Sequence, residues 1–88
     1  MLEIRPTCEN CNKKLPYNSS EAMICTFECT FCQDCVTLLQ QVCPNCRGGF
    51  EKRPIRPKQL LKKYPVSNVV VHKPVNILNY KNSLKTKF

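Results

Sequence analysis

The feature that most constrains this chain is its set of eight cysteines, all of which lie between Cys8 and Cys46. They form four pairs along the chain: Cys8 and Cys11, Cys25 and Cys29, Cys32 and Cys35, and Cys43 and Cys46. Such close spacing lets a tight backbone turn aim both sulfurs of a pair at one ion. Tetrahedral zinc takes four sulfurs, so the pattern predicts two closed, structural Zn²⁺ sites with no position left open for catalysis.

The shortness of the chain favours metal over a hydrophobic core as the source of stability. A chain of 88 residues forms one domain at most and buries a modest share of its surface. Binding one structural zinc ion contributes on the order of 10–16 kcal/mol to folding, which can offset the ordering of a region with little apolar interior.

The compartment is inferred from the beginning of the chain and its apolar runs. The first residues, MLEIRPTCEN, contain no basic stretch followed by an apolar one, so we expect no secretory signal. No apolar run approaches the length of a membrane span. We therefore expect a cytoplasmic protein, in a reducing compartment where cysteines remain thiols or metal ligands.

The cysteine-bearing region carries short secondary-structure signals. Residues 22–27 are predicted to form a strand with Met23, Cys25 and Phe27 on one face, and residues 28–31 the returning limb of a hairpin. Residues 33–42 predict a helix that Pro44 cannot continue. Its apolar positions recur at helical spacing, and we expect Phe27, Phe31 and Leu39 in the core.

Charge divides the chain into an acidic first half and a basic second half. Residues 1–46 hold three basic and five acidic side chains, whereas residues 47–88 hold eleven basic ones and a single acid, Glu51. We therefore predict a two-zinc domain over residues 1–50 and a basic tail, rich in proline and lysine, over residues 51–88. In this tail we expect a helical turn at 59–64, a short strand at 68–72 and fraying over 73–88.

Spacing alone leaves the pairing of the cysteines open. Neighbouring pairs could close each site in sequence, the outermost pairs could nest around the inner ones, or alternate pairs could combine into a cross-brace. The cross-brace interlocks the two sites, so that neither half of the region could fold alone.

The cysteine order resembles that of the RING finger, over residues 8–47. The matching stretches are Phe31-Cys32-Gln33-Asp34-Cys35-Val36, where a RING helix begins, and Cys43-Pro44-Asn45-Cys46-Arg47. Cys29 stands where a RING usually has histidine, so this would be an all-cysteine variant. The whole chain more closely resembles DUF1272, a small bacterial family of unknown function, through Leu2 to Pro6, Pro16 to Cys35 and Cys43 to Cys46.

The resemblance implies a small, metal-organised α+β fold: a RING-like cross-brace with a short β-hairpin, one helix and a basic C-terminal tail. It supports a first site made of Cys8, Cys11, Cys32 and Cys35, and a second made of Cys25, Cys29, Cys43 and Cys46. It brings no established activity.

Catalytic interpretations of the cysteines find little support. A nucleophilic cysteine needs a neighbouring base, and the only histidine, His72, lies in the tail, where we expect a surface residue. The spacing of Cys25, Cys29 and Cys32 matches the cluster-binding triplet of radical-SAM enzymes, but the chain is too short for their barrel. An iron–sulfur cluster on the run from Cys25 to Cys35 would leave four cysteines needing another site.

Ubiquitin-ligase activity is an alternative suggested by the RING resemblance. Pro44 and Arg47 match positions that a RING ligase uses to grip its conjugating enzyme and to orient ubiquitin. The first knuckle, however, carries the polar Glu9 and Asn10 where an apolar contact is expected, and the chain has no tryptophan.

Nucleic-acid binding is the other alternative, because basic side chains cluster after the last cysteine. Phosphate contact by these residues would be salt-dependent and indifferent to sequence. The simpler interpretation is a solvated tail, or one that folds back onto the acidic core. The basic cluster is Arg47, Lys52, Arg53, Arg56, Lys58, Lys62 and Lys63, with Phe50 and Tyr64 at its edges.

We predict a non-catalytic protein-interaction module of unknown oligomeric state that binds two zinc ions.

Overall fold

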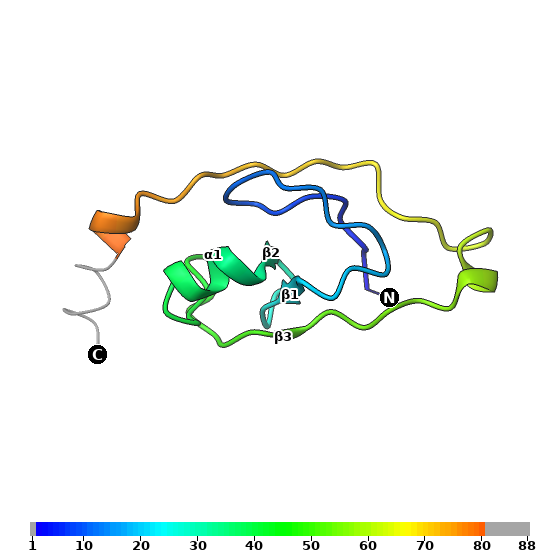
Figure 1. The fold of residues 1–88 in the computed structure, drawn as a ribbon, viewed down its shortest axis with the longest axis horizontal. Coiled ribbons are helices and arrows are strands. Elements are labelled where there is room, and N and C mark those ends of the chain that lie inside the picture. The colour runs from blue at the N-terminus through cyan, green and yellow to red at the C-terminus, as the bar shows by residue number, and fades with distance from the viewer. Residues whose placement is uncertain (1, 81–88) are drawn as a thin grey trace.

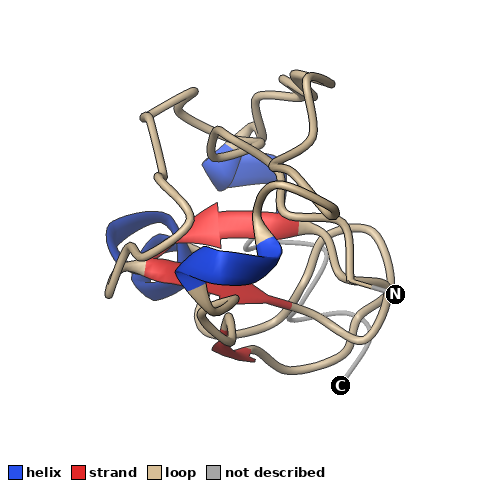
Figure 2. Ribbon diagram, turned by 90° about the vertical axis from the view of Figure 1, so that its right-hand side faces the viewer, coloured by secondary structure: helices blue, strands red, loops and turns tan. Residues whose placement is uncertain are grey.

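A small antiparallel sheet lies at the centre of the protein. The structure is a computed structural model that describes residues 2–80. Its strands are β1 (Ala22–Ile24), β2 (Thr30–Cys32) and β3 (Glu51–Lys52), in the order β2-β1-β3. The ribbon shows the three short strands beside helix α1 (Figures 1 and 2). Met23 pairs with Phe31 on one side and with Lys52 on the other, which fixes the register.

The β1–β2 hairpin confirms the predicted return limb but is tighter than expected. The Cys25 N–H donates to the Cys29 carbonyl at 3.2 Å, and the Glu28 N–H donates to the Cys25 carbonyl at 2.9 Å. Glu28 takes a left-handed backbone with φ of 61°, typical of a three-residue hairpin loop. The strand therefore ends at Ile24, and Phe27 lies in the turn with 69% of its surface exposed. The prediction that Phe27 belongs to the core was wrong.

Helix α1 (Gln33–Leu38) follows β2 directly and is shorter than the predicted 33–42. Asp34 lies in its first turn, where a negative charge suits the helix dipole. Gln40 and Gln41 have φ of 56° and 61°, and this left-handed pair ends the helix before Val42. The early end leaves room for the chain to turn back toward Cys43.

The core is built from a few apolar side chains and the cysteines themselves. Phe31 is buried on β2, and the Phe50 ring meets it edge-on with 5.4 Å between ring centroids. The predicted core residues Phe31 and Leu39 are confirmed as buried. The core cluster contains Leu15, Ala22, Phe31, Val36, Leu39, Tyr80 and six buried cysteines.

The chain after β3 runs out to one end of the molecule and returns. A 3₁₀ turn, η1 (Lys58–Leu60), marks the reversal, and the returning segment passes along the N-terminal residues (Figure 1). Its Ser67 N–H donates to the Ile4 carbonyl at 2.9 Å, and its Lys73 N–H donates to the Glu9 carbonyl at 2.7 Å. Among the described residues no strand forms at 68–72, because the segment makes isolated hydrogen bonds instead of pairing in a ladder.

The buried Arg53 and the half-buried Arg56 hold the segment after β3 to the first residues of the chain. Arg53 is 3% exposed, and its guanidinium donates to the carbonyls of Arg5, Leu15 and Pro16 at 2.8, 3.2 and 2.7 Å. We call Arg53 and its three carbonyl acceptors the arginine clasp. Burial lowers the pKa of Arg53.

The described end of the chain packs on the core, contrary to the predicted fraying from residue 73. Residues 77–80 are helical, and the Tyr80 hydroxyl donates to the Val42 carbonyl. The Arg47 guanidinium lies over the Tyr80 ring, 5.4 Å from its centroid. Residues 81–88 lie outside the described part, and the division into residues 1–50 and 51–88 stays a prediction. No helix of residues 2–80 is long and apolar enough to cross a membrane.

Candidate metal centre

One cluster brings together the first and third cysteine pairs. The sulfurs of these four residues all lie within 4.8 Å of one another, and Cys11 Sγ is 3.7 Å from Cys32 Sγ. Zinc–sulfur bonds of about 2.3 Å would place the corners of a tetrahedron about 3.8 Å apart. The donor set and spacing of this cluster are therefore consistent with a zinc ion. Its members are Cys8, Cys11, Cys32 and Cys35.

The second cluster holds Cys25, Cys43 and Cys46, whose sulfurs also lie within 4.8 Å of one another. Cys29, the fourth residue predicted for this site, lies outside that group. It sits across the hairpin turn from Cys25 and is buried, and its Sγ accepts a hydrogen bond from Asn45 Nδ2 at 3.3 Å. The structure thus groups three of the four predicted residues and leaves the fourth beside them.

The outer two knuckles, around Cys8 and around Cys43, have the same backbone design. The Cys8 N–H donates to the Lys13 carbonyl at 2.9 Å, and the Cys43 N–H donates to the Gly48 carbonyl at 2.9 Å. The residue after the second cysteine, Asn12 or Arg47, has φ of 63° in both. The repeated turn is what aims both sulfurs of each pair to the same side.

Hydrogen-bond donors converge on the sulfurs of the second cluster. The backbone N–H groups of Phe27, Asn45 and Gly48 point at Cys25, Cys43 and Cys46 with N···S distances of 3.3, 3.3 and 3.4 Å. The Thr26 hydroxyl donates to Cys46 Sγ at 3.0 Å. Gly48 permits this approach, because a Cβ there would lie 2.8 Å from the Thr26 methyl group. Such donors favour the thiolate, which is the form that binds metal.

The outer two knuckles also each contain an asparagine whose role was not predicted from the sequence. Asn10 Nδ2 donates to Cys35 Sγ at 3.2 Å, and Asn45 Nδ2 donates to Cys29 Sγ at 3.3 Å. In each case the acceptor is the second cysteine of the pair that the knuckle faces. The motif Cys-x-Asn-Cys begins at both Cys8 and Cys43, and this repeat is the sequence signal that could have identified the two asparagines.

Glu9 links the two clusters. Its side chain is 2% exposed, although it belongs to the first knuckle. Its carboxylate accepts from Arg5 Nη1 at 3.0 Å and from Asn45 Nδ2 at 3.3 Å. A buried carboxylate that is paired in this way joins the first knuckle to the last one across the fold.

The thiol pKa values show what these surroundings do to charge. Burial raises the pKa of Cys25 to about 11, and it also raises the pKa of Cys29, Cys32, Cys35 and Cys43. Burial acts in the same direction on Cys46, but the Thr26 hydroxyl and the Gly48 amide outweigh it and bring its pKa to about 6. Several buried thiolates need a cation to coexist, which a divalent metal supplies.

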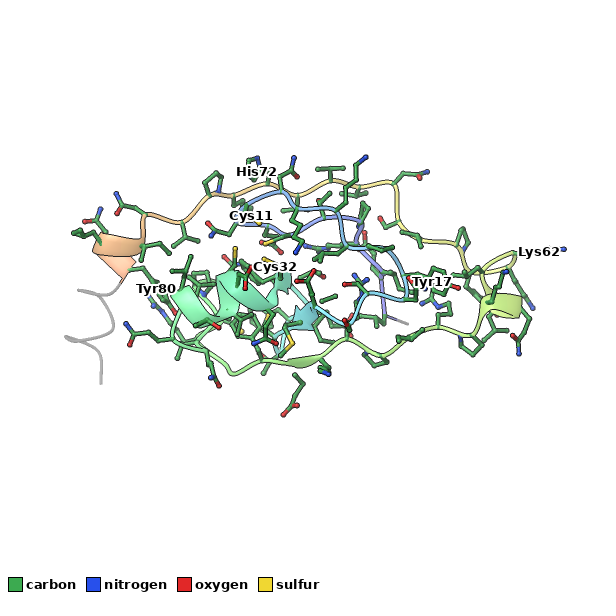
Figure 3. The ribbon with its side chains drawn as sticks, viewed as in Figure 1. Cys11, Tyr17, Cys32, Lys62, His72 and Tyr80 are labelled. Carbon is green, nitrogen blue, oxygen red and sulfur yellow. The ribbon has the colours of Figure 1, made fainter. Side chains whose placement is uncertain are left out.

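The remaining candidate residues lie apart from the clusters. His72 is exposed, as expected, and its Nε2 is 3.2 Å from the Asn10 carbonyl (Figure 3). It joins no metal-competent group among residues 2–80. Of the basic cluster, Arg53 and Arg56 donate to backbone carbonyls, whereas Lys52, Lys58, Lys62 and Lys63 are exposed.

Comparison with known proteins identifies relatives but no activity. The model of DUF1272, a family described as proteins of unknown function, matches residues 1–56. An uncharacterised protein of Rhizobium meliloti (strain 1021) is 56% identical over 75 residues, which cover 84% of this chain and 89% of the relative. No solved structure matches the chain.

Proposed function

The chain belongs to the DUF1272 family, and we propose that it is a non-catalytic protein-interaction module whose shape is maintained by two structural zinc ions. The observation that carries the proposal is the cluster of Cys8, Cys11, Cys32 and Cys35. Four sulfurs within 4.8 Å of one another form a complete tetrahedral donor set. Four protein ligands leave no position for water or substrate, which is the mark of a structural site.

In this proposal Cys29 completes the second site. The equivalence of Asn10 and Asn45 supports it, since Asn45 donates to Cys29 as Asn10 donates to Cys35. Cys29 also lies beside Cys25 across the hairpin turn, so a change of its side-chain rotamer can bring the sulfur toward the other three. The alternate pairs would then form a RING-like cross-brace.

Zinc fits these donors better than other common ions do. Sets made only of thiolates select zinc or iron–sulfur clusters over magnesium and calcium, which prefer oxygen ligands. Two separate groups of cysteines, one of four and one of three with Cys29 beside it, suit two single ions.

Metal analysis tests the proposal. Protein purified under reducing conditions should contain two zinc ions per chain. After cadmium substitution, NMR should correlate Cys8, Cys11, Cys32 and Cys35 with one cadmium ion and the other four cysteines with the second. A content of one ion, an iron–sulfur absorption spectrum, or turnover of a substrate through a cysteine by the zinc-loaded protein would contradict it.

The two alternatives are less well supported by the described residues. Phosphate binding through the basic cluster could not use Arg53 and Arg56 fully, because their guanidinium groups already donate hydrogen bonds to backbone carbonyls. Ligase activity would need an apolar contact in the first knuckle, where Glu9 is buried and paired with Arg5. A binding module that presents its remaining surface to a protein is consistent with both observations.

A further inference from the structure

An apolar groove lies at the end of the molecule where the chain reverses direction. It has a volume of about 460 Å³ and lies between the outgoing segment, η1 and the first residues of the chain. Ile55 and Leu60 keep 56% and 42% of their surfaces exposed there. Its apolar lining includes Leu2, Pro54, Ile55, Pro57, Leu60 and Tyr64.

The floor of the groove is held in place by hydrogen bonds. The Arg56 guanidinium donates to the Tyr64 carbonyl at 2.7 Å and to the Leu2 carbonyl at 2.6 Å, tying its two sides together. The Tyr64 N–H closes the turn by donating to the Leu60 carbonyl at 2.8 Å. Because this groove is already ordered, little conformational entropy is lost in the protein when a partner binds there.

The turn that bears the groove is strongly and uniformly basic. Lys58, Lys62 and Lys63 are exposed on it, and Lys62 extends from the end of the molecule (Figure 3). The sequence contains no acidic residue after Glu51. Glu3, on the neighbouring N-terminal segment, already accepts a hydrogen bond from the Ser67 hydroxyl at 2.6 Å and lies 4.0 Å from Arg5 Nε.

We propose that this groove docks an acidic peptide segment of a partner protein. One aliphatic or aromatic side chain of the segment enters the groove, and neighbouring carboxylates face Lys58, Lys62 and Lys63. Charge complementarity selects the acidic segment, and the apolar lining distinguishes it from nucleic acid, whose backbone offers no aliphatic group to bury. The proposal rests on the interaction-module function and gives its partner a chemistry.

Selection of short random peptides displayed on phage against the zinc-loaded full chain tests the proposal. Selected sequences should be enriched in aspartate and glutamate around one leucine, isoleucine, methionine or phenylalanine. A synthetic peptide of the selected sequence should shift the NMR signals of residues 54–64. Leu60→Ser should weaken binding about tenfold or more, whereas Leu38→Ser, at an exposed leucine of α1, should leave it unchanged.

Replacement of Lys58, Lys62 and Lys63 together by glutamine should also weaken binding about tenfold at low salt, and less at high salt, with Lys73→Gln as the control. The proposal is overturned if no acidic sequence is enriched, if Leu60→Ser has no effect, or if only an oligonucleotide or anionic vesicles shift residues 54–64. Zinc content measured on the same samples separates the two hypotheses. A chain that holds two zinc ions but binds no peptide contradicts only the proposed docking groove. A chain that holds fewer than two zinc ions contradicts the proposed two-zinc module.

Discussion

At the scale of single residues, side-chain amides and a carboxylate surround the candidate metal ligands. Asn10 and Asn45 each direct a side-chain amide at a cysteine sulfur of the pair opposite, and Glu9 accepts from Asn45 in turn. Such outer partners orient ligands and tune metal affinity, commonly by 10- to 100-fold. The clusters are therefore better described as interlocking networks than as sets of four sulfurs.

We expect Asn45→Ala to weaken zinc binding at the second site by about tenfold or more, because it removes donors to Cys29 and to Glu9. Competition with a chromophoric chelator under reducing conditions measures the loss. Asn18→Ala, at an exposed loop asparagine, is the matched control and should bind zinc as the wild type does. Equal affinities in the two variants would contradict this role of Asn45.

Cys29→Ser tests whether Cys29 is the fourth ligand. With cobalt in place of zinc, the intensity of the sulfur-to-metal charge-transfer absorption should fall by about one eighth, since each of the eight bound thiolates contributes to it. Cys35→Ser, at the equivalent position of the first site, should produce the same fall. An unchanged spectrum in Cys29→Ser alone would show that Cys29 is not a ligand.

Sequence reasoning located the cysteines but not the groups around them. Ligand type and the C-x2-C spacing are visible in short stretches of sequence, so two metal sites could be expected from composition and spacing. The partners of Asn10, Asn45 and Glu9 depend on which pair meets which, and this is fixed only when residues far apart in the chain come together. The sequence marks Glu9 only as a polar residue of the first knuckle, yet its side chain is buried.

At the scale of elements, the turns determine the structure more than the strands and the helix do. Within residues 2–80, five residues other than glycine have a left-handed backbone, and each lies in a turn after a cysteine pair, before Cys29 or at the end of α1. The strand and helix predicted for residues 22–27 and 33–42 were too long for this reason. Apolar periodicity continued through both turns, whereas the backbone had to reverse to bring the next cysteines to the clusters.

We expect Gln41→Gly to stabilise the protein by about 0.5 kcal/mol. Glycine adopts the φ of 61° found at Gln41 without steric cost, and this gain exceeds its greater freedom in the unfolded chain. Gln33→Gly, at the first residue of α1, should instead destabilise by about 0.5 kcal/mol, because a helical backbone disfavours glycine. Urea unfolding of the zinc-loaded variants compares the two, and a change of the same sign in both would contradict the argument.

At the scale of the whole molecule, the basic second half is part of the fold over its described length. The arginine clasp fixes the outgoing segment to the N-terminal residues, and the returning segment donates to Ile4 and Glu9. The lysine-, arginine- and proline-rich sequence of this second half has no apolar periodicity that could have predicted the packing. Its contacts include guanidinium-to-carbonyl and backbone hydrogen bonds, which leave no pattern in the sequence.

We expect Arg53→Lys to destabilise the protein by about 2–4 kcal/mol, because one ammonium group cannot reach the carbonyls of Arg5, Leu15 and Pro16 together. Urea unfolding at fixed free zinc measures the loss. Lys52→Arg, at the exposed neighbouring position, is the control and should change stability little. If Arg53→Lys unfolds at the same urea concentration as the wild type, the clasp is not a structural tie.

The alternation of cysteine pairs along the chain has a consequence for metal removal. Cys25 of the second cluster lies in sequence between the two pairs of the first, and Cys32 and Cys35 lie between Cys25 and Cys43. We therefore expect the two clusters to assemble together, since each pair brought into one cluster also brings segments of the other one close. Chelation under reducing conditions should remove both ions in one cooperative step and abolish the structure, since metal binding and folding are linked.

Native mass spectrometry during a chelator titration, followed in parallel by circular dichroism, distinguishes this from independent sites. Cooperative loss predicts chains with two ions or none, with few carrying one, and a dichroism signal that follows the two-ion fraction. A large population holding one ion and half of the native signal would mean that the clusters fold separately. Retention of the native signal after complete chelation would mean that packing in this small core is sufficient without metal.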